Sequence, residues 1–419
     1  MIRIWRKENM KRCKFSSNYS YKLESNLTYH AVGHGLFSTG RILIKTTGNL
    51  TQDAFNYVYD CGTRSKGKFL SDKISNFSVK NNEDFDLAVI SHFDKDHVNG
   101  FEKLLINRRV KKLVLPYLQP KQRLFFALKY YSYNKDISSM IYNPTSYFKE
   151  FSEEIIYIVE GNDKYEQKYD ENSKKYNGRE LNKENFKNDF ILKTDISKIY
   201  SDLELMYYNL VKFKFFNKEI DDSQLTCFYR DVESILDKYG VKLDENLFYN
   251  KTVINEIKKI YKKLPYGINN SSICMSVTSI EESLNFKAKN CKCIKSQLLG
   301  VEPYHEKCQQ IFGYMFTGDL SLNDTTNYRV YNDFIEYYNE EKKKISIFTI
   351  PHHGSKHNWN KDLLNQFSNA EMIITAAGNK LHPAPIVLRE LSVASRANTT
   401  VNHTLNKEFF NEVYYVSKK

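Results

Sequence analysis

The sequence has no apolar run that approaches the roughly 20 consecutive residues of a transmembrane helix. Its first residues are charged and lack the apolar stretch of a secretory signal peptide. Cysteine is also sparse, with seven in 419 residues, and this odd number favours reduced thiols over a framework of disulfide bonds. We therefore expect a chain that does not enter a membrane and that resides in the cytoplasm.

Acidic residues are outnumbered by basic ones, 50 against 62, so the formal net charge is +12 and the pI is about 9.0. This balance favours anionic partners such as nucleic acid or phosphorylated substrates. The excess of Lys, Asn, Tyr and Ile is also typical of an AT-rich genome, which enriches lysine without a functional demand. The length allows two domains, or one large domain with an insertion.

Glycine nearly disappears from residues 121–265, and this change of composition divides the chain. In residues 27–120, short apolar strands are separated by glycine-containing turns, and the strand pattern returns in residues 266–419. Strands that alternate with helices indicate a layered α/β architecture. Within 121–265 apolar residues recur at helical spacing, which predicts a mostly helical insertion. Residues 1–26 then form an N-terminal extension.

One short segment is dense in residues that bind metals. The apolar run 87–90 reads as a buried strand, and it leads directly into His92, Asp94, Asp96 and His97. Neutral imidazole nitrogens and carboxylate oxygens are the usual ligands of zinc, manganese or iron at hydrolytic sites. The alternative interpretation is a solvated, charged turn after a strand. The same residue types recur at later strand ends, which favours the metal site.

Three later strands also end in residues that could take part in such a site. Asp319 follows the strand that ends at Phe316, and a loop after residues 371–377 reaches His382. The strand 345–350 is followed by Pro351-His352-His353-Gly354-Ser355, where glycine allows a sharp turn that presents both imidazole rings. A weaker cluster, Cys291, Cys293, His305 and Cys308, is either a structural zinc knuckle or a set of unpaired thiols.

The order of these motifs, preceded by Tyr59-Asp60-Cys61-Gly62, resembles the metallo-β-lactamase superfamily. Within it, the chain resembles the branch typified by the soluble nuclease domain of bacterial competence DNA-uptake proteins. The resemblance covers roughly residues 27–116 and 267–419, so that 27–120 and 266–419 would be two halves of one domain, and it matches nothing in 121–265. It implies an αββα sandwich with a large, mostly helical insertion and a metal site at one edge.

The resemblance also implies roles for individual residues and one or two divalent ions, Zn or Mn. His92, Asp94 and Asp319 would hold one metal, and Asp96, His97, Asp319 and one of His352 or His353 would hold a second. A water between the metals would become the nucleophile, so that Asp96 belongs to the catalytic set. His353 and His382 could hydrogen-bond a phosphate oxygen or protonate the leaving group. Ser355 and Lys356 would contact the phosphate.

The sequence departs from the family pattern at three points. Asp94 stands where most members have histidine, which favours manganese or magnesium-like ions over zinc. No residue clearly fills a later histidine position, although His305 lies in the interval. Gly33-His34-Gly35-Leu36 replaces the branch's usual Gly-Gln-Gly-Asp, so a polar group near the site is lost or exchanged.

We therefore expect a metal-dependent hydrolase that cleaves phosphodiester bonds in DNA or RNA. The first alternative is hydrolysis of a small molecule, such as a cyclic nucleotide, a phosphoester or a lactone, beneath an insertion that caps the site. The second is a binding module with a degenerate metal site. The insertion could also bind protein partners, which the sequence does not identify.

Overall fold

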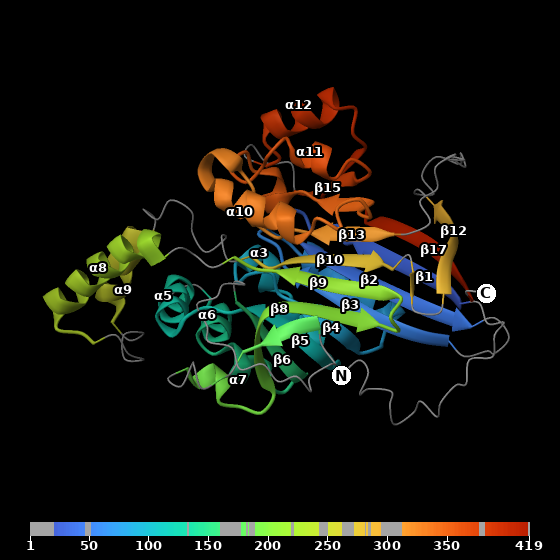
Figure 1. The fold of residues 1–419 in the computed structure, drawn as a ribbon. Coiled ribbons are helices and arrows are strands. Elements are labelled where there is room, and N and C mark those ends of the chain that lie inside the picture. The colour runs from blue at the N-terminus through green and yellow to red at the C-terminus, as the bar shows by residue number, and fades with distance from the viewer. Residues whose placement is uncertain are drawn as a thin grey trace.

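The structure, a computed structural model, describes residues 21–46, 52–131, 134–159, 177–181, 183, 189–218, 222–242, 250–261, 272–280, 282–283, 286–294, 312–376 and 382–417 (Figure 1). The strands are β1 (Tyr21–Tyr29), β2 (Phe37–Thr46), β3 (Gln52–Cys61), β4 (Phe85–Val89), β5 (Val110–Pro116), β6 (Ser152–Ile158), β7 (Asn177–Glu180), β8 (Ser197–Tyr207), β9 (Val211–Phe216), β10 (Cys274–Ser279), β11 (Glu282–Ser283), β12 (Phe286–Ile294), β13 (Gly313–Phe316), β14 (Ile347–Thr349), β15 (Glu371–Thr375), β16 (Asn398–Val401) and β17 (Lys407–Ser417). The helices are α2 (Phe69–Lys80), α3 (Lys95–Val98), α4 (Phe101–Leu105), α5 (Pro120–Tyr131), α6 (Lys135–Tyr142), α7 (Pro144–Phe148), α8 (Asp222–Tyr239), α9 (Lys251–Tyr261), α10 (Asp324–Tyr337), α11 (Leu363–Gln366) and α12 (Pro385–Val393), with short 3₁₀ turns η2 (Phe190–Leu192) and η5 (Pro351–Gly354).

The strands form one hydrogen-bonded series with two arms. The first arm is antiparallel from β1 to β3 and parallel from β3 to β6. Strand β8 joins the arms, because it pairs with β6 at its start and with β9 at its end. The second arm is antiparallel from β9 through β10 to β13 and parallel from β13 to β16. Strand β17 pairs with β1, and β12 pairs with β17.

Alternate side chains of the strands enter different buried clusters, as the pleat of a strand requires. Leu87 and Val89 of β4 join a cluster that also contains Tyr314 of β13, so this cluster holds residues of both arms. Ala88, between them in sequence, joins a second cluster with α2 and α4–α7. Met315 of β13 joins a third cluster with α10, α11 and α12, which Figure 1 shows above the strands. The α/β class expected from the sequence is confirmed.

Residues 121–265 contain helices α5–α9, as expected, but also strands β6–β9, which the sequence analysis did not predict. In β9, Val211, Phe213 and Phe215 are buried and alternate with the less buried Lys212 and Lys214. Because lysines occupy the alternate, less buried positions, β9 is polar overall. Its alternation of apolar and polar residues is therefore hard to recognise in a segment whose composition is typical of surface helices. Because β6, β8 and β9 belong to the main series of strands, part of this segment lies in the sheet, and the mostly helical insertion stays a prediction. The division at 27–120, 121–265 and 266–419 stays a prediction.

Helices α8 and α9 pack on α5 through a fourth cluster, which includes Phe125, Val232 and Ile257. Figure 1 shows this helical group at the side of the molecule opposite β12 and the C-terminus. The cluster is separate from the three that contain strands, so the group is anchored to the sheet mainly through α5. Among the described residues, no helix is long and apolar enough to cross a membrane.

Helix α5 is tied to the rest of the domain by a buried ion pair. The guanidinium of Arg123 donates to both oxygens of Asp189, at 2.9 and 2.5 Å, and Tyr117 Oη donates to Asp189 at 2.8 Å. The side chains of Arg123 and Asp189 are 1% and 3% exposed. Such a pair contributes little relative to an apolar pair, but removing one partner leaves an uncompensated buried charge.

We therefore expect Asp189→Ala to lower the free energy of unfolding by about 3–5 kcal/mol, because Arg123 keeps its charge without a counterion. Urea unfolding followed by circular dichroism measures the change. The matched control is Asp195→Ala, which removes the same side chain at an exposed position and should change the free energy by less than about 0.5 kcal/mol. Equal effects of the two substitutions would contradict this role of the pair.

Candidate metal centre

The candidate residues meet where the parallel strands end. His92, Asp96 and His97 follow β4, Asp319 follows β13, and His352 and His353 lie in η5 after β14. The carboxyl ends of the strands in each arm lie at one edge, and side chains that follow them converge there. Gly62 allows its loop to approach α3 closely, because a Cβ there would lie 2.4 Å from the backbone nitrogen of His97. The Asp60-Cys61-Gly62 motif thus has a packing reason.

The first group that could hold a metal ion consists of His92, His97 and Asp319, all buried. Nε2 of His97 lies 3.1 Å from Oδ1 of Asp319, and Nε2 of His92 lies 3.6 Å from Oδ2. On its other side, His97 Nδ1 is 2.7 Å from the carboxylate of Asp60, which also accepts hydrogen bonds from the backbone and hydroxyl of Ser91. A carboxylate can only accept, so His97 carries its proton on Nδ1 and turns Nε2 toward Asp319.

The backbone at Asp60 supports this orientation. Asp60 has φ +55°, in the left-handed region that costs a non-glycine residue of the order of 1 kcal/mol or more. Its three hydrogen bonds, from His97 and twice from Ser91, hold the residue in that conformation. His352 and His353 also have positive φ, at +46° and +55°. Three of the seven non-glycine residues with positive φ in the described part of the chain thus place or form the site.

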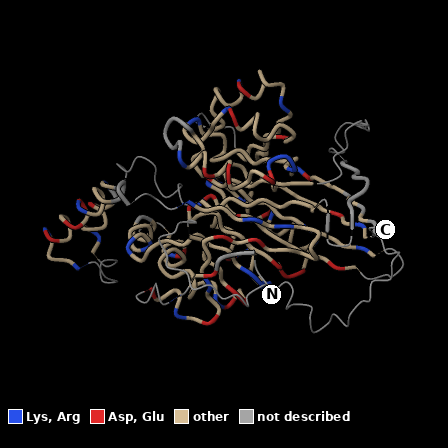
Figure 2. The backbone as a smooth tube through the Cα atoms, in the orientation of Figure 1, with Lys and Arg blue, Asp and Glu red and all other residues tan. Residues whose placement is uncertain are grey.

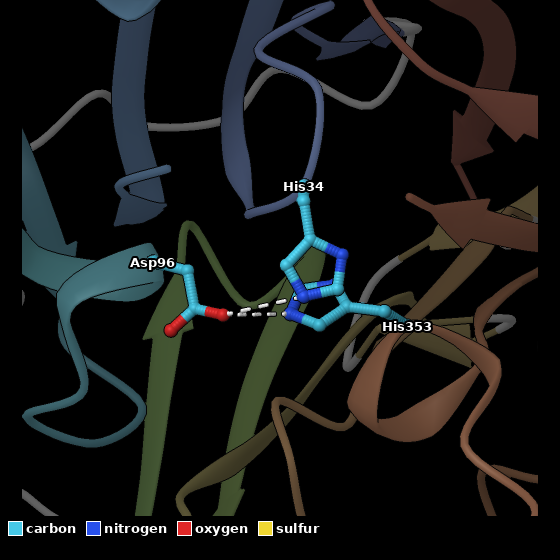
Figure 3. A group of neighbouring side chains, drawn as sticks. All are labelled: His34, Asp96 and His353. Atoms are coloured by element: carbon cyan, nitrogen blue, oxygen red, sulfur yellow. Dashed lines mark ion pairs between the residues drawn. The ribbon is translucent and has the colours of Figure 1, made fainter. Parts of the chain in front are cut away.

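The second group consists of His34, Asp96 and His353, which Figure 3 shows pointing toward one another from three separate segments. Nε2 of His353 lies 3.3 Å from Oδ2 of Asp96, and Nε2 of His34 lies 3.8 Å from the same oxygen. His353 Nδ1 lies 2.6 Å from the carbonyl oxygen of Thr375. Since a carbonyl only accepts, His353 also has its proton on Nδ1 and directs an Nε2 lone pair into the group.

Asp319 connects the two groups. Its Oδ1 lies 3.8 Å from Nε2 of His353, and its Oδ2 lies 3.5 Å from Nε2 of His352. His352 Nδ1 is 2.9 Å from the Asn358 side-chain oxygen, while the Asn358 amide nitrogen donates to the Asp319 carbonyl. Both adjacent histidines therefore reach Asp319, and of the two only His353 belongs to a three-residue group.

The electrostatics of the imidazoles suit metal binding. Burial lowers the pKa of His34 to about 3 and that of His92 to about 4, so both are neutral near pH 7. For His97, burial acts in the same direction, but the carboxylates of Asp319 and Asp60 outweigh it and raise the pKa well above its usual value. Metal ions bind unprotonated imidazole, which suits His34 and His92. The raised pKa of His97 shows that positive charge is strongly favoured at its position.

Several buried polar atoms lack a partner unless a cation is bound. Within the described residues, Nε2 of His92, His97 and His353 is buried and makes no hydrogen bond. A buried polar atom without a partner costs roughly 1–3 kcal/mol. Since these nitrogens point at carboxylate oxygens, which are also acceptors, a proton or a metal ion must satisfy them. The donor set of two imidazoles and one carboxylate in each group fits a divalent transition metal.

Asp94 is in neither of the two groups, and its role as a metal ligand stays a prediction. Its Oδ2 lies 2.7 Å from Nη2 of Arg64, and its Oδ1 accepts a hydrogen bond of 2.5 Å from Tyr130 of α5. The arginine, in the loop after β3, gives this carboxylate a cationic partner that the sequence motif does not reveal. The preference for manganese over zinc inferred from Asp94 stays a prediction.

His34 is the residue that the sequence analysis did not assign. The Gly33-His34-Gly35 turn between β1 and β2 carries it to Asp96, although it lies far from the other motifs in sequence. Its signal was present as the departure from the branch's Gly-Gln-Gly-Asp pattern, but a turn histidine has no periodicity that gives its partner. His305, the sequence candidate for a further ligand, lies outside the described residues, as does Cys308.

The remaining predicted residues lie around the two groups. His382 is half-buried, and its ring centroid lies 5.4 Å from that of His352 and 5.5 Å from that of His34. Burial, followed by His352, lowers its pKa to about 4. Ser355 is buried directly after η5, and Lys356 is exposed. Neither residue joins a three-residue group.

Comparison with known proteins gives limited information. No protein-family model matches the sequence, and no curated protein matches it. A crystal structure of a long form RNase Z from yeast resembles this structure with a TM-score of 0.40 and 10% sequence identity, over 91% of this chain and 41% of that chain. This chain thus spans about two fifths of the yeast chain. A likeness at this level assigns neither a family nor an activity.

Proposed function

We propose that the chain is a metal-dependent hydrolase of metallo-β-lactamase type, with an αββα arrangement, that cleaves phosphodiester bonds in nucleic acid. One observation carries the proposal: two buried His-His-Asp groups adjoin through Asp319. Paired metal sites that share a carboxylate are typical of phosphatases and nucleases. The relation to the competence branch and the cytoplasmic location stay predictions of the sequence.

His92, His97 and Asp319 would hold one ion, and His34, Asp96 and His353 would hold the other. Bound divalent ions would activate a water and neutralise charge that develops on a phosphoryl oxygen. The residues of the chain fix the geometry: Asp60, Thr375 and Asn358 each hold one imidazole with Nε2 directed inward. His382, neutral at pH 7 and beside His352, is placed to hydrogen-bond the leaving group.

Nucleic acid is proposed as the substrate from the charge of the chain and the chemistry of the site. Figure 2 shows basic and acidic positions interspersed along the strands and helices, so the net charge of +12 does not by itself define a binding face. Nucleic acid is proposed because phosphodiester chemistry suits the paired groups and because a basic chain tolerates an anionic polymer. The degenerate-site alternative loses support, because His34 supplies the second group with a third side chain.

The first test concerns the metals. We expect the full chain, stripped with EDTA and dialysed against Mn or Zn, to retain close to two ions per chain by mass spectrometry of the metal. Asp319→Ala should lose at least one ion and lower the affinity of the other by about 10–100-fold, since it removes the carboxylate that both groups share. The control Asp72→Ala, exposed on α2, should bind like the wild type. A wild-type protein that binds no ion would refute the metal centre.

The second test concerns catalysis. With Mn present, cleavage of single- and double-stranded DNA and RNA should fall about 10²–10⁴-fold in Asp96→Ala and His353→Ala, because each removes a ligand of the second ion. The control His357→Ala removes an exposed histidine close in sequence and should retain wild-type activity. Cleavage that survives Asp96→Ala would exclude this centre as its source.

A further inference from the structure

Arg64 lies beside the metal centre and has no part in the roles assigned above. Its Nη2 is 2.7 Å from Oδ2 of Asp94 and 3.0 Å from Oδ1 of Asp96. Asp96 belongs to the second group, so the guanidinium touches the outer side of a proposed metal ligand. The side chain of Arg64 is 43% exposed, whereas those of Asp94 and Asp96 are 6% and 0% exposed. Arg64 therefore reaches from solvent to the edge of the centre.

The position of Arg64 is held from two directions. At the loop end, its backbone nitrogen donates to the carbonyl oxygen of His34 at 2.7 Å. At the other end, Asp94 is itself fixed by Tyr130 of α5, at 2.5 Å. Polar contacts therefore run without a break from Tyr130 of α5 through Asp94 and Arg64 to Asp96 of the second group. The Arg64 side chain is thus held in place before a ligand binds. Less conformational entropy is then lost on binding.

Most of the guanidinium's hydrogen-bonding capacity is unused. The group has five N–H donors, and the contacts of Arg64 with Asp94 and Asp96 both involve Nη2. Among the described residues, the side-chain hydrogen bond of Arg64 is the one from Nη2 to Asp94. If Arg64 served only to neutralise Asp94, a bidentate contact buried from water would be the expected geometry. Instead, one nitrogen bridges two carboxylates and the rest of the fork stays available.

Arg64 also lies next to His34 of the second group, because the Arg64 backbone N–H donates to the His34 carbonyl oxygen. His34 and His382 have ring centroids 5.5 Å apart. Since Nη2 of Arg64 lies 3.0 Å from Asp96, an anion bound beside Asp96 would lie close to the other donors of the guanidinium.

We propose that Arg64 binds a phosphoryl oxygen of the substrate beside the second metal group, and that Asp94 and Tyr130 position it. This inference rests on the proposed function in naming a phosphoryl group as the ligand. Arginine suits this role because its planar fork matches two phosphate oxygens and its charge does not titrate in the physiological range. Asp94 then has a role different from that of the histidine found there in most metallo-β-lactamase-type proteins. It holds the Arg64 guanidinium in place and does not bind a metal ion.

The test uses the full chain loaded with Mn, and inorganic phosphate as the probe. Isothermal titration should show that the wild type binds phosphate and that Arg64→Met weakens binding by about 10–100-fold, because a charge-assisted contact is lost. Arg64→Lys, which keeps the charge but not the fork, should lie between them. Lys66→Met, which removes an exposed charge two residues away, should bind phosphate like the wild type. Manganese content should be unchanged in all three variants, whereas Arg64→Met should lower the melting temperature, because the buried Asp94 loses its cationic partner.

Two results would overturn the assignment: a wild type that does not bind phosphate, or an Arg64→Met variant that binds it as tightly as the wild type. Hydrolysis is measured separately, so the two proposals can fail independently. If the protein cleaves a phosphodiester, Arg64→Met should raise KM while Arg64→Lys restores part of the loss. If it cleaves none but its phosphate binding depends on Arg64, the anion site stands and the hydrolase proposal falls.

A second variant tests the role of Asp94. As a positioning residue, Asp94 contributes no metal bond, so Asp94→Asn should retain the manganese content of the wild type. The phosphate affinity of Asp94→Asn should at the same time depart from the wild-type value, because the guanidinium loses its charged anchor. Loss of one manganese ion in the Asp94→Asn variant would mean that Asp94 binds a metal ion. That result would overturn its role as the residue that positions Arg64.

Discussion

The site depends on one buried carboxylate that faces four imidazole nitrogens. Asp319 lies between 3.1 and 3.8 Å from Nε2 of His92, His97, His352 and His353, and it is fully buried. For His97, His352 and His353, the hydrogen bond at Nδ1 goes to an oxygen that accepts, so Nε2 of the neutral ring is also an acceptor. Acceptors that face acceptors repel one another, and only positive charge between them reverses the sign. The site therefore favours a cation, either a proton or a metal ion, between these groups.

This demand explains features that are far apart in the chain. Asp60 adopts a strained backbone to orient His97, Gly62 brings the loop after β3 against α3, and Thr375 at the end of β15 orients His353. Each of these residues follows or ends a strand whose interior side chains are packed in the core. A packed core resists small shifts, so the positions of the ligands are set by the sheet rather than by flexible loops.

The sequence alone identifies the members of the two groups that follow strands, and it does not reveal the other residues of the site for identifiable reasons. His92, Asp96, His97, Asp319 and His353 stand directly after apolar runs, and the pattern of such runs is legible in one sequence. His34 lies in a turn, and Arg64 meets Asp94 across 30 residues, so neither pairing leaves a local pattern. The strands of 121–265 were missed because lysine occupies the outward positions of β9, which conceals the alternation. Sequence periodicity indicates helices and strands, whereas the side-chain contacts between them depend on how these elements pack.

The net charge of the chain and the charge of the site have opposite signs and different ranges. Exposed lysines act through solvent, where salt screens them beyond about 8–10 Å. At the centre, Asp94, Asp96 and Asp319 are buried carboxylates, and nearby histidines and Arg64 hold the pKa of Asp96 far below its usual range in spite of burial. These carboxylates would repel an anionic substrate, and bound divalent ions would offset that charge. Among the described residues, Arg64 is the one permanent cation in contact with these carboxylates, and its place beside Asp96 would let it contribute to holding such a substrate.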